Sequence, residues 1–229
     1  MKKTAITLAA LTFGIGTVLA GPAPVVSTGK STPPPPLMDP CAGAISYNNV
    51  ELLYAYTDID GRYDRGSESA NGVRLAVEYS PMSNLYFTLG AEYNDFDSGS
   101  TWMLQGGIGG YIKLTDNIDL ASDIGLAWGE AEADIYVPDV IGDGGDYYSE
   151  TNDDWGWYAR PHLRAKFGCL TIKVGAEYYD FDLNASDSNG KWYFVTNLYY
   201  QVAPNWDLTG GVRAGEDATQ WTGGVRWRY

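Results

Sequence analysis

The chain has few of the residues on which nucleic-acid binding and acid–base chemistry depend. Among its 229 residues there is one histidine, His162, and there are two cysteines, Cys41 and Cys169. Only 15 lysines and arginines stand against 29 acidic residues, which gives a formal net charge of −14. Phosphate contacts need clustered cations, so we expect no nucleic-acid partner.

Long apolar runs are also scarce. The sequence has one, at its N-terminal end. Lys2 and Lys3 precede an apolar stretch over 5–20 that has small residues near Ala20. A stretch of about 16 residues is short for a spanning helix, which needs roughly 20. We therefore interpret 1–20 as a secretory signal peptide, with an uncleaved anchor as the alternative. If the exported chain enters a membrane, it does so as a closed barrel, since barrels and helices alone satisfy every backbone polar group in hydrocarbon.

Proline is concentrated in one segment, 21–47, where serine and threonine lie between the prolines. Such a composition is extended and semi-rigid and builds no core of its own. We predict a Pro-rich periplasmic linker over 21–47, followed by one barrel domain over 48–229.

From Val50 to the last residue, apolar and polar side chains alternate, as they do on the two faces of a strand. The chain is rich in Gly, Tyr and Trp, yet its mean hydropathy is −0.25, as expected when only one face of each strand is apolar. We predict an all-β fold, a transmembrane antiparallel up-and-down β-barrel of about ten strands, with eight as the alternative. The predicted strands are 49–58, 72–80, 85–94, 101–114, 118–128, 155–167, 170–179, 191–202, 206–215 and 221–229.

The connections between these strands support the barrel. Every second one is short, and those between them are mostly longer, the pattern of outer-membrane barrels with periplasmic turns and extracellular loops. The alternative is a soluble sandwich or lipocalin-like barrel, but the polar face carries more ionisable groups than a soluble core could bury unpaired. The short connections are 81–84, 115–117, 168–169 and 203–205, and the longer ones 59–71, 95–100, 129–154, 180–190 and 216–219.

The polar face carries charges of both signs, which we expect to pair across the lumen. Barrels of about eight strands are just filled by side chains, whereas aqueous porins need about 16 strands. We therefore expect a largely filled lumen, with a narrow path for ions or very small solutes as the alternative. The predicted lumen residues are Glu51, Arg74, Glu78, Glu92, Asp119, Asp123, Arg160, His162, Arg164, Lys166, Lys173, Glu177, Arg213, Arg226 and Arg228.

The two cysteines should meet on the turn side of the barrel. Cys41 precedes the first strand, and Cys169 lies in the short connection between the sixth and seventh. Disulfides persist in the oxidising periplasm. We predict a bridge between them that ties the linker to the base of the barrel; two unpaired or intermolecularly paired thiols are the alternative.

Two features could carry chemistry, and both have plainer interpretations. The segment 129–154 is acidic without one Lys or Arg, and its oxygens could hold a divalent cation. It lacks the ligand spacing of a calcium loop, so we interpret it as a solvated surface loop and expect no metal or cofactor. His162 could act as a general base, as in some barrel hydrolases, but it lies between Arg160 and Arg164, which disfavours that role. We expect no catalytic site.

The last nine residues, WTGGVRWRY, place Trp221, Val225, Trp227 and Tyr229 on one face of a strand that ends on an aromatic residue. With the export signal and the alternating strands, this ending resembles the small outer-membrane β-barrel proteins of Gram-negative bacteria, the opacity-protein and porin-like group. The resemblance covers about 50–229 and implies an insertion signal at those four residues, read by the barrel-assembly machinery. The group commonly ends on Phe rather than Tyr.

Members of that group serve as adhesins, structural anchors, small channels or lipid enzymes, so the fold does not fix the function. We expect a monomeric, non-enzymatic barrel in contact with outer-membrane lipid and lipopolysaccharide, acting through its acidic loops in adhesion, surface interaction or envelope integrity. A narrow passive channel is the second hypothesis, and an outer-membrane hydrolase the third.

Overall fold

The computed structural model describes residues 41, 44–59, 68–138, 145–180, 190–216 and 218–229, without the side chains of 134–138 and 145–148. The predicted signal peptide and most of the predicted linker lie outside these residues. In the described part of the chain, no helix is long and apolar enough to cross a membrane.

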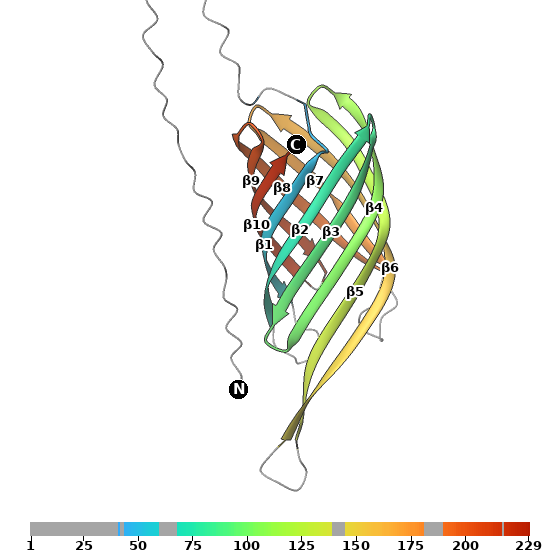
Figure 1. Ribbon diagram of the computed structural model, residues 1–229, viewed down its shortest axis with the longest axis vertical. Coiled ribbons are helices and arrows are strands. Elements are labelled where there is room, and N and C mark those ends of the chain that lie inside the picture. Colours follow the sequence, from blue (N-terminus) through green and yellow to red (C-terminus); the bar gives the residue numbers. More distant parts are fainter. Residues whose placement is uncertain (1–40, 42–43, 60–67, 139–144, 181–189, 217) are drawn as a thin grey trace, which may run out of the picture. The chain divides into compact units, whose positions relative to one another are not determined.

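Ten antiparallel strands close into one barrel in which sequence neighbours pair, and β10 pairs with β1 at the seam (Figure 1). The prediction of an all-β up-and-down barrel is confirmed, with ten strands and not eight. The strands are β1 (Asn49–Ile59), β2 (Glu68–Met82), β3 (Leu85–Phe96), β4 (Gly99–Thr115), β5 (Ile118–Pro138), β6 (Gly145–Phe167), β7 (Leu170–Asp180), β8 (Lys191–Ala203), β9 (Trp206–Gly215) and β10 (Ala218–Arg228).

Two-residue turns join the strands at one end of the barrel, which we call the turn side. They are 83–84, 116–117, 168–169 and 204–205, within the connections predicted to be short. Asn84 and Gly168 adopt φ values of 72° and 57°, and such left-handed backbone is what tight turns use. The first residue of β1 and the last residue of β10 are partners, so the chain enters and leaves the barrel on the turn side.

Three connections predicted to be long are shorter. The segments 95–100 and 216–219 reduce to two residues each between strands, and most of 129–154 is strand, since β5 continues to Pro138 and β6 begins at Gly145. Charged and small residues dominate these segments, which made them resemble loops. Beyond a membrane, however, both faces of a hairpin can be polar, so pairing continues where the apolar alternation ends.

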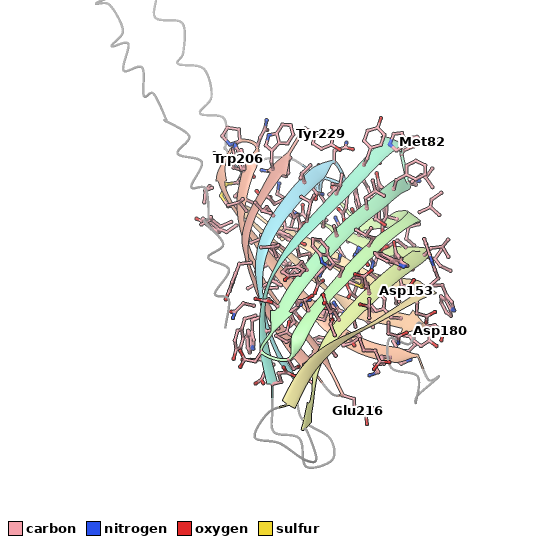
Figure 2. All side chains as sticks on the ribbon, turned by 60° about the horizontal axis from the view of Figure 1, so that its bottom comes forward. Met82, Asp153, Asp180, Trp206, Glu216 and Tyr229 are labelled. Carbon is pink, nitrogen blue, oxygen red and sulfur yellow. A yellow bond between two sulfur atoms is a disulfide. The ribbon has the colours of Figure 1, made fainter. Side chains whose placement is uncertain are left out.

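The outward face of the barrel is apolar over its middle. Leu89 is 63% exposed, Leu126 62% and Ile124 55%, exposures unusual for so many large apolar side chains in water. Figure 2 shows Trp206 and Tyr229 at the turn-side rim, and the acidic residues Asp180 and Glu216 at the other end. An apolar belt with aromatic rims is the lipid-facing surface of a transmembrane barrel.

Candidate functional site: the barrel interior

An aromatic cluster built on Tyr47, which precedes β1, is packed inside the barrel near the turn side. Its ring stacks on Tyr111 with centroids 4.1 Å apart and lies 5.0 Å from Tyr86. The Arg164 guanidinium lies over the same ring at 4.3 Å, a cation–π contact. Burial holds the pKa of the Tyr47 hydroxyl well above its ordinary value, so the hydroxyl keeps its proton and donates to Asp119 at 3.3 Å.

Arg164 links this cluster to the opposite part of the barrel. Its guanidinium donates two hydrogen bonds to Glu78 of β2, one of them 2.8 Å long. Asn49 donates to the same carboxylate at 2.9 Å. Arg164 also donates through Nε to His162 Nε2 at 3.2 Å, which leaves Nδ1 as the protonated nitrogen, 3.0 Å from the carbonyl of Arg160. Both ring nitrogens of His162 are therefore occupied.

A second ion pair lies in the lumen between direct partners on the neighbouring strands β5 and β6. Arg160 donates to Asp123 through Nε at 2.8 Å and through Nη2 at 2.5 Å, and both side chains are buried. Tyr86 donates to the other oxygen of Asp123 at 3.3 Å. Thr88 and the Tyr158 hydroxyl, 2.9 Å apart, lie beside the same guanidinium. This carboxylate and cation are thus desolvated but hydrogen-bonded, as buried charges require.

The third group lies nearer the other rim. Arg213 of β9 lies 3.5 Å from Glu177 and 3.8 Å from Glu92, and Arg74 lies 4.0 Å from Glu92. Gln220 donates to Glu92 at 2.7 Å. These contacts join β2, β3, β7, β9 and β10 across the interior.

A fourth group joins β10 to β9. Arg226 of β10 donates to Asp207 of β9 at 2.7 Å, and Arg228 lies 3.2 Å from the same carboxylate. The Arg226 guanidinium lies 3.7 Å from the centre of the Tyr199 ring. The sequence prediction omitted Asp207, although its position between the outward Trp206 and Leu208 assigns it to the inward face.

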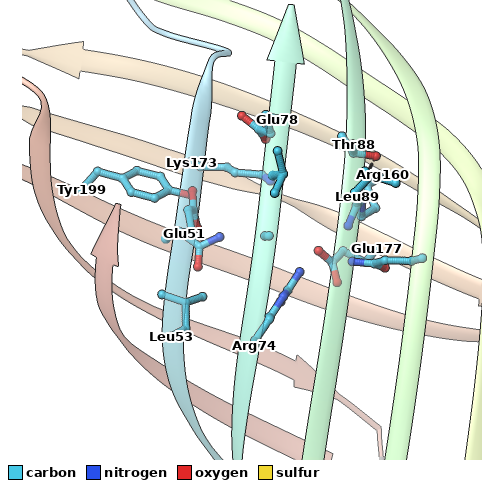
Figure 3. A pocket seen from close by; sticks show the side chains of 14 residues that line it. Glu51, Leu53, Arg74, Glu78, Thr88, Leu89, Arg160, Lys173, Glu177 and Tyr199 are labelled. Carbon is cyan, nitrogen blue, oxygen red and sulfur yellow. Dashed lines mark hydrogen bonds between the residues drawn. The ribbon is translucent and has the colours of Figure 1, made fainter. Parts of the chain in front are cut away.

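Between these groups lies a small cavity of about 40 Å³, room for only a few water molecules. Glu51, Lys173 and Tyr199 line it from β1, β7 and β8 (Figure 3). Its charged lining combines three carboxylates with three cations, Glu51, Glu78, Glu177, Arg74, Arg160 and Lys173. The cavity therefore favours neither sign of charge.

The structure places every predicted lumen residue on the inward face. Arg164 is 1% exposed, and Asp119, Asp123, Arg160, His162, Lys166, Glu177 and Arg226 are also buried. The inward tyrosines were not predicted, although strand alternation assigns Tyr86, Tyr158, Tyr179 and Tyr199 to this face. Tyr47 had no such signal, because it lies outside the alternating strands.

Cys41 and Cys169 form a disulfide with a Cα–Cα distance of 4.7 Å. The bridge ties the segment before β1 to the turn between β6 and β7. It therefore holds Tyr47 and its neighbours at the turn-side mouth. Pairing of the two cysteines was predicted; the entry of Tyr47 into the barrel was not.

The acidic hairpin shows no metal site in its described part. Among the residues that the structure describes, no three His, Cys, Asp or Glu side chains are grouped as metal ligands. The tip of the hairpin, 139–144, lies outside these residues. Glu132 instead accepts a hydrogen bond from Ser149 at 2.6 Å, and Asp153 accepts one from the Trp128 indole at 3.4 Å.

No protein-family profile matches the sequence, and no curated protein matches it. Similar solved structures include Neisserial surface protein A, at 13% identity over 82% of this chain and 100% of that chain, with a TM-score of 0.40. The translocator domain of the autotransporter NalP from Neisseria meningitidis is 9% identical over 79% of this chain and 88% of its own, with a TM-score of 0.42. Outer membrane phospholipase A from Escherichia coli is 13% identical over 80% and 97%, with a TM-score of 0.35. These likenesses concern the fold alone.

The architecture itself gives the location. An antiparallel barrel with an even number of strands, an apolar outer belt, aromatic rims and a charged interior is that of the bacterial outer-membrane barrels. The protein is a small outer-membrane barrel.

Proposed function

We propose that this barrel is a non-enzymatic anchor that presents the β5–β6 hairpin outside the membrane for contact with a surface partner, in adhesion or in envelope integrity. The part of the hairpin concerned is 129–138 with 145–156, here called the β5–β6 arm. The observation that carries the proposal is the length of this arm. β5 and β6 remain paired as far as Pro138 and Gly145, whereas β4 begins only opposite Ala133 and the last residue of β7 lies opposite Trp157. Figure 1 shows the arm running past the neighbouring strands.

The filled interior favours the function of an anchor and disfavours that of a pore. The Tyr47 cluster lies at the turn-side mouth, and ion pairs between non-adjacent strands cross the lumen, Arg164 with Glu78 and Arg213 with Glu92 and Glu177. Opening a wide path would separate buried charges from their partners, which costs several kcal/mol for each ion. The apolar belt provides contact with membrane lipid, and the aromatic C-terminal strand is where we expect the barrel-assembly machinery to act.

The experiment shortens the arm in register. Ala133 and Glu150 are direct partners, so replacing 134–149 by Asn-Gly joins the two strands through a hairpin turn and keeps the β4–β5 ladder intact. We expect this variant to insert normally and to lose binding of cells to host-cell or matrix surfaces, or the envelope's resistance to detergent. A matched control places Asn-Gly at Asp97 and Ser98, a turn at the same rim. Unchanged surface binding and envelope resistance in the shortened variant would overturn the proposal.

A narrow channel is the second candidate, and the cavity beside Lys173 favours it. Its water-sized space with balanced charge could form part of a path for small ions. Planar-bilayer recording separates the two functions, because an anchor gives no steady conductance, whereas a channel gives a conductance that changes in Lys173→Glu.

The third candidate, a hydrolase, has less support. His162 donates through one ring nitrogen and accepts through the other, so neither is free to take a proton from a nucleophile. Hydrolysis of peptide or lipid that is lost in His162→Ala would favour the enzyme.

A further inference from the structure

Two charged side chains face the central cavity of the lumen without a partner. They are Glu51 of β1 and Lys173 of β7 (Figure 3). Within the part of the chain that the structure describes, neither the Lys173 ammonium nor the Glu51 carboxylate makes a hydrogen bond or an ion pair. Charges taken out of bulk water usually have such partners, so the two groups indicate a binding site.

The formal charges of the cavity lining cancel, but its contacts do not. Three of the six charged groups already have a close partner of opposite sign, in the pairs Arg164 with Glu78, Arg160 with Asp123 and Arg213 with Glu177. The remaining three are Glu51, Lys173 and Arg74. Arg74 lies 4.0 Å from Glu92 and makes no hydrogen bond to any described residue. The groups that lack close partners are therefore two cations and one carboxylate, an excess of one positive charge.

Two neutral side chains add donors to the same cavity. The Tyr199 hydroxyl and the Asn197 amide line it, and neither is hydrogen-bonded among the described residues. The Tyr199 ring is buried, with the Arg226 guanidinium 3.7 Å from its centre. The apolar side chain of Leu53 lines the cavity as well, and such surroundings strengthen electrostatic attraction. The free donors of the cavity therefore outnumber its free acceptors.

We propose that this cavity binds a small monovalent anion such as chloride, held by Lys173 and Arg74, with Tyr199 and Asn197 as neutral donors. One anion balances the one positive charge in excess. The space of about 40 Å³ accepts an ion of one atom with a few water molecules, and excludes a large organic anion. The inference goes beyond the proposed function and does not depend on it, because a lumen that does not conduct can still hold an ion.

The first test measures the stability of the full-length barrel in lipid vesicles by urea unfolding. Sodium chloride is compared with sodium gluconate at equal ionic strength, because gluconate is too large for the cavity. When free chloride reaches about ten times its Kd, the unfolding equilibrium constant should be about tenfold lower in chloride than in gluconate.

Three variants connect this effect to the cavity. Lys173→Gln should remove the difference between the two salts, whereas Lys113→Gln, which changes an exposed lysine of β4, should keep it. Glu51→Gln should enlarge the difference, because it removes the negative charge that opposes the anion. Equal stability of the parent barrel in the two salts would overturn the proposal, since Lys173 and Glu51 would then satisfy each other through bridging water.

A second measurement locates the ion without any substitution. Crystals of the parent barrel grown in sodium bromide should give an anomalous difference peak within hydrogen-bond distance of the Lys173 ammonium and beside the Arg74 guanidinium. This measurement holds even if Lys173→Gln does not fold. The absence of a peak in the cavity, or bromide bound only at other places, would overturn the site.

Discussion

Arg164 of β6 and Glu78 of β2 are joined by two hydrogen bonds across the interior of the barrel, although 86 residues separate them in the chain. The direct strand partner of Arg164 on β5 is Asp119, yet its guanidinium is turned to Glu78, and Asp119 is bound by Tyr47 instead. This exchange of partners places the Arg164 guanidinium between the aromatic cluster and β2. The interior is thus held together by contacts across the lumen as well as along the sheet.

Arg164→Gln should destabilise the barrel by about 3–5 kcal/mol, because it leaves the Glu78 carboxylate buried without its cation. Urea unfolding in lipid vesicles, followed by tryptophan fluorescence, measures the loss. The double variant Glu78→Gln, Arg164→Gln removes both charges and should recover part of the stability. Losses that simply add in the double variant would show that the pair does not interact.

Tyr47→Ala should lower the free energy of unfolding by about 3 kcal/mol, since a buried ring that packs on Tyr86 and Tyr111 is lost. Tyr47→Phe keeps the ring and loses only the hydrogen bond to Asp119, so about 1 kcal/mol is expected. The same urea titration compares the two. Similar losses in both variants would mean that the hydroxyl, and not the stacking, holds the segment.

Reduction of the disulfide should lower stability by up to about 5 kcal/mol, because the bridge closes a loop with a sequence separation of 128 residues in the unfolded chain. Urea titrations with and without a phosphine reductant measure the difference. Cys41→Ser and Cys169→Ser serve as controls that should match the reduced protein and not respond to reductant.

Ile124→Arg should destabilise the inserted barrel by about 2–4 kcal/mol, because it places a charge in the middle of the lipid-facing belt. The matched control is Glu132→Arg, which makes the same side chain beyond the belt on the same face of β5 and should cost little. Folding yields in vesicles of increasing acyl-chain length compare the two. Equal folding yields for the two variants would contradict the inference that this face of β5 contacts lipid.

Deleting Trp227, Arg228 and Tyr229 should reduce assembly into the outer membrane several-fold. Trp227 and Arg228 pair with Val50 and Asn49 at the seam, and the Tyr229 amide donates to the Asn48 carbonyl at 3.2 Å. Heat-modifiable mobility of outer-membrane fractions on gels measures the folded barrel. Tyr229→Phe is the control and should assemble as the parent does.

Much of the fold could be predicted because lipid imposes a strict alternation. Leu52, Tyr54 and Tyr56 had to face one way and Leu53 and Ala55 the other, so one register satisfied the whole strand. The same parity assigned Arg160, His162 and Arg164 to the lumen. The same parity assigns Asp207 to the lumen. The prediction of lumen residues omitted it, because a single acid beside Trp206 is a weak signal.

Other features could not be predicted, since alternation gives a side chain its face and not its partner. Arg164 had acidic candidates on several strands, and the choice of Glu78 depends on the width and shear of the closed barrel. The β5–β6 arm was missed for the opposite reason, because outside the membrane no apolar face is needed and the strands carry no distinct pattern there. Tyr47 lies in the segment 21–47, whose composition predicted a linker.

The disulfide between Cys41 and Cys169 makes a covalent ring out of part of a barrel that is otherwise closed by hydrogen bonds. β1 to β6 lie inside the ring, and β7 to β10 lie outside it. A protease cut anywhere in the β5–β6 arm therefore leaves two fragments that stay joined. If the oxidised chain is pulled from its two ends, its last four strands can unfold and extend. The first six strands cannot add to the end-to-end length, because the disulfide joins the residues that flank them.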